Sequence, residues 1–302
     1  MSTQITVAQV DQFSNNIEHL TQQGDSRFAG KLRTETQVGK SKFFEQLGST
    51  SAIKRTARHA DTPRVDSVHE RREVRLNDYD WSDLIDTLDP NKMLISPQSS
   101  YAQSAAMAFN RAKDQEVIDN ATGAAFANKS GNGANGTTST ALPSTQKILV
   151  DHDAAGTNTG LTLGKLIGTK SILGKNEVPK GSKIYLVHTQ QQLDDLLINV
   201  NQVQSSDYAA VKALNDGEVS YFMGMEFIKT ELLELGSIGT DIRKCFAYAH
   251  NGLLLSVGQD FKARVSERAD KNHATQVYAN MSVGSTRMQE SQVVEVQCDE
   301  SP

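Results

Sequence analysis

The chain has 302 residues, of which 37% are hydrophobic and 6% aromatic, and its formal net charge is −5 at pH 7. The length suits one large or two medium domains, while the lean apolar content predicts that part of the chain lies outside any single compact core. The negative charge argues against a protein that mainly binds phosphates tightly. Only two cysteines occur, Cys245 and Cys298, so we expect buried free thiols instead of a disulfide framework or a zinc site.

The sequence also argues against membrane and secreted proteins. No stretch of 18 consecutive apolar residues occurs, and residues 1–20 contain no basic segment followed by an apolar run. We therefore expect neither membrane insertion nor secretion, and a protein that is made in the cytoplasm.

The first 80 residues read as a polar arm followed by a charged hairpin. Residues 1–48 are rich in Gln, Thr and Ser and lack a steady apolar period, so we interpret them as an arm. Residues 49–80 hold 13 charged side chains in 32 positions, and Pro63 together with the alternation at 74–76 suggests strands joined by a turn. Because an isolated two-stranded ribbon is marginal in water, this hairpin needs a surface to lie on, either elsewhere in the chain or on a neighbouring subunit.

A long helix is predicted over residues 97–122. Ser96 suits the N-cap and Pro97 the first helical position, and alanines then recur at spacings of three and four, which predicts a narrow stripe for close packing. Gly123 ends the run of helix-forming residues. The following Gly/Asn/Ser/Thr-rich segment, 128–143, predicts a flexible connection and a domain boundary.

Residues 145–255 mix helical and strand patterns and predict a compact domain. The apolar run at 183–187 reads as a buried strand, and residues 190–200 read as a helix with Leu193, Leu196, Leu197 and Val200 on one side.

The last 45 residues predict strands. Apolar residues alternate with period two at 261–265, at 277–283 and at 294–298. We interpret these as three strands of one half-buried sheet, with the long helix covering one face.

Two short patterns could indicate chemistry. The glycines of 131–136 have the spacing of a dinucleotide fingerprint, but a helix precedes them and a Thr/Ser run follows, so we interpret the segment as a loop and expect no cofactor. Asp151, His152 and Asp153 could belong to a metal site or a hydrolase centre, yet adjacent residues rarely converge on one ion, and a solvated turn is the preferred interpretation. No nucleophile elbow, phosphate-binding loop or Cys-x-x-Cys pattern occurs, so an enzyme is not expected.

The charged hairpin is the best candidate for function. Charges of both signs can supply complementarity and register for pairing with another copy of the same chain. The residues proposed for such a subunit interface are Arg55, Arg58, Arg64, Arg71, Arg72, Glu73 and Arg75.

The order of these elements, and several local stretches, resemble the HK97-like major capsid proteins of tailed bacteriophages. Residues 38–44 (VGKSKFF) resemble the segment before the extended loop of this family, and residues 96–101 resemble the start of its spine helix. Residues 264–270 (RVSERAD), followed by 276–278 and Gly284, are similar to its peripheral-domain sheet. The resemblance spans nearly the whole chain.

The resemblance implies an α+β, HK97-like capsid fold with its usual parts. These would be an N-terminal arm at 1–48, an extended loop at 49–83, a peripheral domain with the spine helix at 84–144 and 256–302, and an axial domain at 145–255. In this family the extended loop lies across the neighbouring subunit, which agrees with the argument from its missing core.

The implied function is structural. Copies of the chain would assemble into pentamers and hexamers of an icosahedral shell around double-stranded DNA, which they would contact weakly. The chain would be located in the virion capsid and, during assembly, in the host cytoplasm. Expected partners are a scaffolding protein, a portal and a decoration protein. A separate scaffolding protein is expected because the arm is too short to serve as a built-in scaffold. The alternatives are an encapsulin-type nanocompartment shell, which the polar arm disfavours, and a hydrolase using Asp151, His152 and Asp153.

Overall fold

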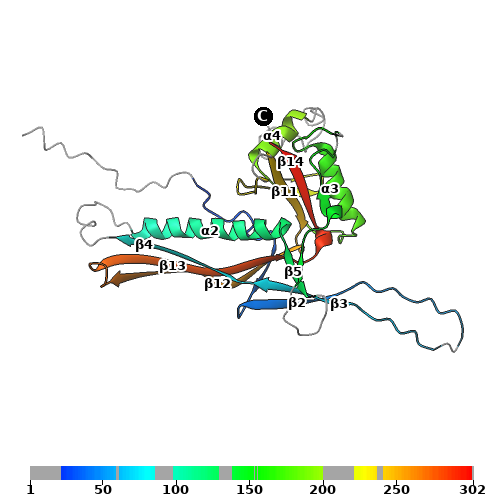
Figure 1. The fold of residues 1–302 in the computed structure, drawn as a ribbon, viewed down its shortest axis with the longest axis horizontal. Helices are drawn as coiled ribbons and strands as arrows, with labels where there is room; N and C mark the ends of the chain where they lie inside the picture. The colour runs from blue at the N-terminus through cyan, green and yellow to red at the C-terminus, as the bar shows by residue number, and fades with distance from the viewer. Residues whose placement is uncertain are drawn as a thin grey trace, which may run out of the picture. The chain divides into compact units, whose positions relative to one another are not determined.

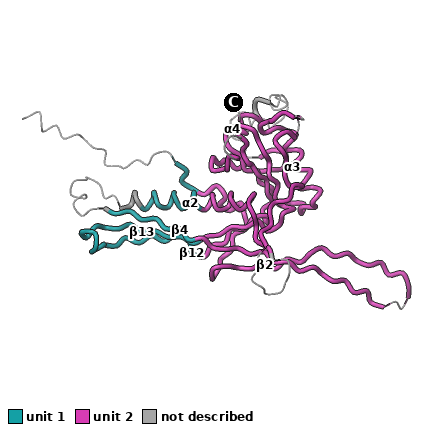
Figure 2. The backbone as a smooth tube through the Cα atoms, viewed as in Figure 1, with its two compact units in different colours: residues 1–25, 78–112, 259–282 teal, residues 26–77, 113–258, 283–302 magenta. Residues whose placement is uncertain are grey.

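The computed structural model describes residues 22–58, 61–85, 98–128, 138–152, 154, 156–199, 221–236 and 241–300. It is a mixed α+β structure with three β-sheets (Figure 1). The chain divides into two compact units, one made of residues 1–25, 78–112 and 259–282 and the other of residues 26–77, 113–258 and 283–302 (Figure 2). None of the helices in the described residues is long and apolar enough to cross a membrane.

A six-stranded sheet organises the larger unit. Its strands, in spatial order, are β7 (Lys147–Ile148), β14 (Val293–Asp299), β11 (Ile242–Ala249), β8 (Ile184–His188), β10 (Met225–Lys229) and β9 (Tyr221–Phe222). Two helices, α3 (Leu163–Lys175) and α4 (Gln190–Asn199), bury leucines in the same core as these strands. The strand predicted at 183–187 and the helix predicted at 190–200 are therefore confirmed to within one residue, although the side chains of Leu197 and Val200 lie outside the described residues.

The same core takes in the segment before residue 37. Phe28 is buried, and its ring stacks on Phe246 with the centroids 6.4 Å apart. The carboxylate of Asp114 accepts hydrogen bonds from Ser26 Oγ at 2.5 Å and from the Arg27 backbone N–H at 2.8 Å. The described part of the predicted arm thus packs onto its own chain, while residues 1–21 lie outside the described residues.

A four-stranded antiparallel sheet forms the base of a long loop. Its order is β2 (Ser41–Leu47), β3 (His69–Arg75), β5 (Ala125–Asn128) and β6 (Thr138–Thr140). The loop itself covers residues 48–68 and is closed by a hydrogen bond from Gly48 N to Val68 O at 2.7 Å. Figure 1 shows it extending beyond β2 and β3. The strands expected within 49–80 do not pair with each other, because β3 pairs with β2, which precedes that range, and β4 (Asn77–Ile85) joins another sheet.

Helix α2 (Gln98–Thr122) confirms the helix predicted at 97–122, whereas the capping pair Ser96 and Pro97 lies outside the described residues. Only glycine fits directly after the helix, at position 123, because a Cβ there would overlap the carbonyl oxygen of Asp119. In the smaller unit the first part of α2 packs on strands, and the rings of Phe109 and Phe261 lie edge to face at 5.5 Å.

The three C-terminal strands form as predicted but do not share one sheet. β12 (Leu253–Arg268) and β13 (Ala274–Arg287) are neighbours in the sheet β1-β12-β13-β4, where β1 is Arg33–Thr36. β14 instead lies between β7 and β11 in the six-stranded sheet. The reason is burial on both faces of β14, where even Glu295 is buried and paired with Lys147 at 3.0 Å. A half-buried edge position therefore does not suit this strand.

Candidate subunit interface

The loop at 48–68 presents apolar and charged side chains to solvent. Ile53, Val65 and Val68 are all exposed, each by more than 40% of its surface. The hydrogen bonds of its arginine side chains are local: Arg55 Nε donates to Ala57 O at 2.9 Å, and Arg64 Nε donates to Asp66 Oδ1 at 3.0 Å. The described part of the loop therefore makes no side-chain hydrogen bond to the body of its own chain.

The sheet at the base of the loop has one covered and one open face. Phe44 packs against the buried cluster of Val74, Leu254 and Met288. Side chains alternate along the strand, so Phe43 and Leu47 lie on the opposite face, where they are 49% and 65% exposed. Two large apolar side chains on an open sheet face, next to an exposed apolar loop, mark a surface suited to protein contact.

A buried ion cluster ties this base to the rest of its unit. Arg72 Nη2 donates to both carboxylate oxygens of Glu290, at 2.7 and 2.9 Å. Arg287 Nε lies 3.9 Å from the same carboxylate, and its Nη1 donates to the carbonyl oxygens of Ala121 at 2.9 Å and Gly123 at 2.8 Å. A cation at the C-terminal end of α2 satisfies carbonyl groups that have no partner within the helix. Burial lowers the pKa of Arg287.

In the single chain, three of the predicted interface residues are exposed and could contact a partner subunit. Arg55, Arg58 and Arg64 are all exposed on the loop. Arg71 is half-buried on the open face of the sheet, where its Nε lies 2.6 Å from Glu45 Oε1.

The other three predicted residues are engaged within their own chain. Arg72 is buried and pairs with Glu290, and Glu73 is buried and paired with Arg75 at 2.9 Å. The Arg75 guanidinium also lies 4.2 Å from the centroid of the Phe126 ring. Sequence alone could not separate these residues from the loop arginines, because both groups lie in one continuous charged run.

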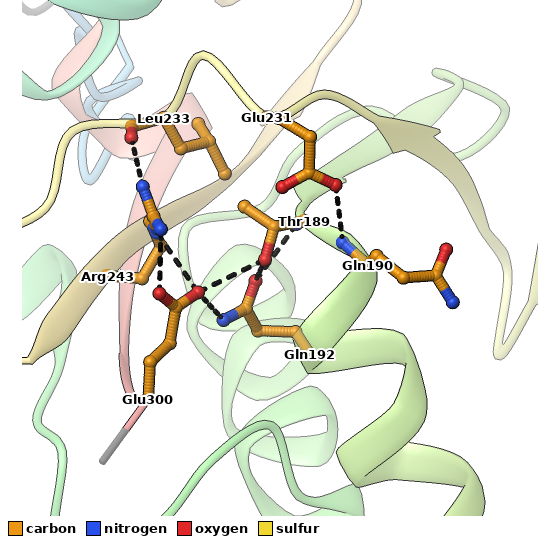
Figure 3. Close-up of polar contacts among 7 residues, drawn as sticks. All are labelled: Thr189, Gln190, Gln192, Glu231, Leu233, Arg243 and Glu300. Atoms are coloured by element: carbon orange, nitrogen blue, oxygen red, sulfur yellow. Dashed lines mark hydrogen bonds and ion pairs between the residues drawn. The ribbon is translucent and has the colours of Figure 1, made fainter. Parts of the chain in front are cut away.

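A second polar cluster, which sequence reasoning missed, lies at the N-terminal end of α4 (Figure 3). Arg243 donates to the two carboxylate oxygens of Glu300 at 3.0 and 2.7 Å, and to Leu233 O at 2.7 Å. Glu300 also accepts from Gln192 Nε2 at 2.6 Å, and Thr189 Oγ1 lies 3.2 Å from the same carboxylate oxygen. Burial works to raise the pKa of Glu300, but the hydrogen bonds from Arg243 and Gln192 outweigh it and hold that pKa below its ordinary value.

This cluster also caps α4. The backbone N–H of Thr189 donates to Gln192 Oε1 at 2.9 Å, and the Thr189 hydroxyl donates to the same atom. The backbone N–H of Gln190 donates to Glu231 Oε1 at 2.9 Å (Figure 3). The available signal was the Thr-x-x-Gln spacing, which is typical of a capping box. The contacts of this cluster indicate a structural role, which is to hold the start of α4 against β11 and the C-terminal end of β14.

The patterns weighed for chemistry remain unassembled in the described residues. Asp151 and His152 lie in a turn, and Asp153 and the glycines of 131–136 lie outside the described residues. In the part of the chain that the structure describes, no three His, Cys, Asp or Glu side chains are grouped to hold a metal ion. Cys245 and Cys298 are buried free thiols, as predicted, and a hydrogen bond between them together with burial raises the pKa of Cys245.

Solved capsid structures share this fold over nearly the whole chain. The capsid of cyanophage P-SCSP1u matches with a TM-score of 0.75 at 16% identity, covering 100% of this chain and 96% of that chain. The capsid of Ralstonia phage GP4 matches with a TM-score of 0.71 at 7% identity, over 98% and 97% of the two chains. The head structure of Helicobacter pylori bacteriophage KHP40 matches with a TM-score of 0.69 at 9% identity, over 96% and 94%. The fold is thus the HK97-like fold of phage capsid subunits.

The family follows from the sequence itself. The family model described as phage capsid protein matches residues 5–300. The chain therefore belongs to the phage capsid protein family and is a major capsid protein, a structural subunit of an icosahedral shell. No curated protein is significantly similar to it in sequence. The family is not a class of enzymes, and the match favours a phage shell over an encapsulin.

Proposed function

We propose that copies of this chain assemble into pentamers and hexamers and that the resulting shell encloses double-stranded DNA. Rings form when one surface of a subunit binds a different surface of the next copy and the rotation closes. The observation that carries the proposal is the loop at 48–68, whose exposed apolar and arginine side chains make no side-chain hydrogen bond to the body of their own chain.

The loop would lie across a neighbouring subunit. Burying Ile53, Val65 and Val68 there would remove apolar surface from water. Arg55, Arg58 and Arg64 would then pair with carboxylates of the neighbour and set the register. The remaining predicted residues, Arg71, Arg72, Glu73 and Arg75, would hold the base of the loop in position.

Sheet membership supports an assignment of the axial and peripheral roles. We propose the axial role for the domain at 145–255, extended by β14, because that strand shares a sheet with β8 and β11. The peripheral role would fall to the unit with the first part of α2 and the outer halves of β12 and β13.

Other proteins would take part in assembly. We propose a scaffolding protein, a portal and a decoration protein as partners, with assembly in the host cytoplasm. The packaged DNA would be contacted weakly, since the chain carries a net charge of −5.

Negative-stain electron microscopy with light scattering tests the proposal. The chain is expressed alone and together with its neighbouring genes, and we expect closed shells or sheets of hexamers. A stable monomer under all conditions would contradict self-assembly.

Charge reversal on the loop tests its role. We expect R55E/R58E/R64E to remain folded, with an unchanged melting temperature, because among the described residues these side chains form no hydrogen bond or ion pair with the body of the chain. We expect it to lose assembly through repulsion at the contact. The matched variant R55K/R58K/R64K keeps the charge and should still assemble; equal assembly by both variants would show that the loop charges are not at a subunit contact.

A further inference from the structure

A lysine-rich surface lies on α3 and the turn that follows it. Lys170, Lys175, Lys180 and Lys183 are all exposed, and in this stretch Glu177 is the one exposed carboxylate. Among the described residues, none of the four lysines forms an ion pair. We call these four residues the lysine patch. It is a local concentration of positive charge in a chain whose net charge is −5.

Two of the four lysines lie near the turn of the β9–β10 hairpin. Lys170 Nζ donates to Met223 O at 3.0 Å, and a Cβ on Gly224 would lie 3.6 Å from that Nζ. Ile184 pairs with Met225 in a parallel register, so Lys183 lies beside Gly224. The exposed Tyr221 hydroxyl borders the same glycine, since the same Cβ would lie 3.9 Å from it. The tertiary fold thus places Lys170 and Lys183, which are separated in sequence, beside the same glycine.

Local helix stability accounts for only part of the patch. Lys175 lies in the last turn of α3, where a cation interacts favourably with the helix dipole. Lys180 and Lys183 lie beyond the helix and gain nothing from this effect, and Lys170 lies more than a turn before its end.

The composition of the patch distinguishes it from the extended loop. The loop offers mainly arginine, whose planar guanidinium suits carboxylates and protein interfaces. The patch contains only lysine, which is depleted in protein interfaces but binds phosphate as a mobile point charge.

We propose that the lysine patch binds the phosphate backbone of double-stranded DNA without reading its sequence. The inference rests on the proposed function, which supplies DNA as the enclosed polymer, and it assigns the weak DNA contact to named residues. Four phosphate contacts give a slope of about −3.6 in log K against log salt, so affinity would fall about a hundredfold between 50 and 200 mM salt.

Binding of a fluorescent DNA duplex to the full-length chain, measured by anisotropy over a salt series, tests the proposal. The test variant is K170Q/K175Q/K180Q/K183Q. The control, K40Q/K262Q/R264Q/K271Q, removes the same charge from exposed cations elsewhere. We expect the patch variant to lose at least tenfold in affinity at 50 mM salt and most of its salt slope, while the control changes by less than threefold.

Equal losses in the two variants would overturn the proposal, because net charge would then explain the binding. Unchanged DNA binding combined with failed shell assembly in the patch variant would also overturn it and would indicate a contact with an acidic protein surface. Electron microscopy of the unmodified chain reports separately on the proposed function, since DNA binding is measured whether or not shells form.

Discussion

Arg72 of β3 donates two hydrogen bonds to Glu290, and the Arg72 side chain is only 4% exposed. Together with Arg287, which is fully buried, this places two guanidinium groups around one carboxylate. A buried ion pair is itself a modest source of stability, but removing one partner leaves an uncompensated charge. Glu290 therefore holds the base of the extended loop in place.

Replacing that carboxylate should be costly. We expect E290Q to lower the free energy of unfolding by about 2 kcal/mol, less than for a fully buried pair because Glu290 is 24% exposed. The matched variant E45Q removes the carboxylate of the exposed Arg71–Glu45 pair and should cost less than about 1 kcal/mol. Urea unfolding of both variants measures the difference, and equal costs would contradict the role given to Glu290.

Gly284 marks a close approach between two strands. A Cβ at this position would overlap the carbonyl oxygen of Arg75, whereas a Cβ on Gly174 of α3 meets nothing within 4 Å. We expect G284A to destabilise the protein by about 3 kcal/mol, since backbone must move. G174A should instead stabilise it by about 0.5 kcal/mol, because alanine loses less backbone entropy in a helix. Thermal melts of the two variants should shift in opposite directions.

His188 should make stability depend on pH. It is buried, its Nδ1 lies 2.8 Å from Thr189 O, and burial lowers its pKa from the ordinary value of 6.5. The unfolded chain then binds a proton more readily than the folded one, so this contribution to stability is present above pH 6.5 and declines as pH falls below it. We expect the urea midpoint to drop more between pH 7.5 and pH 5.5 for the wild type than for H188Q. Parallel declines would show that His188 is not the titrating group.

Glu300 should act at lower pH. Its folded-state pKa is held below the ordinary value of 4.5, so its contribution is present above pH 4.5 and is lost as pH falls through the lowered pKa. We expect E300Q to be less stable than the wild type at pH 7, with a difference that narrows under acid conditions. A difference independent of pH would indicate lost packing instead of lost charge.

The sequence by itself determined the elements whose signals are local. The helix at 97–122, the strand at 183–187 and the helix at 190–200 were predictable because helical and strand periods repeat within a few residues. The exposed loop after residue 48 was predictable because its charged, core-poor composition cannot bury itself.

The tertiary structure alone decided which strands pair and which charges are buried. β12, β13 and β14 carry similar apolar patterns, yet β14 joins β7 and β11, since strand pairing depends on partners distant in sequence. Likewise Arg71 and Arg72 are adjacent, but alternation across the sheet sends one to the open face and the other to Glu290. Their roles differ because burial is a property of the packed fold.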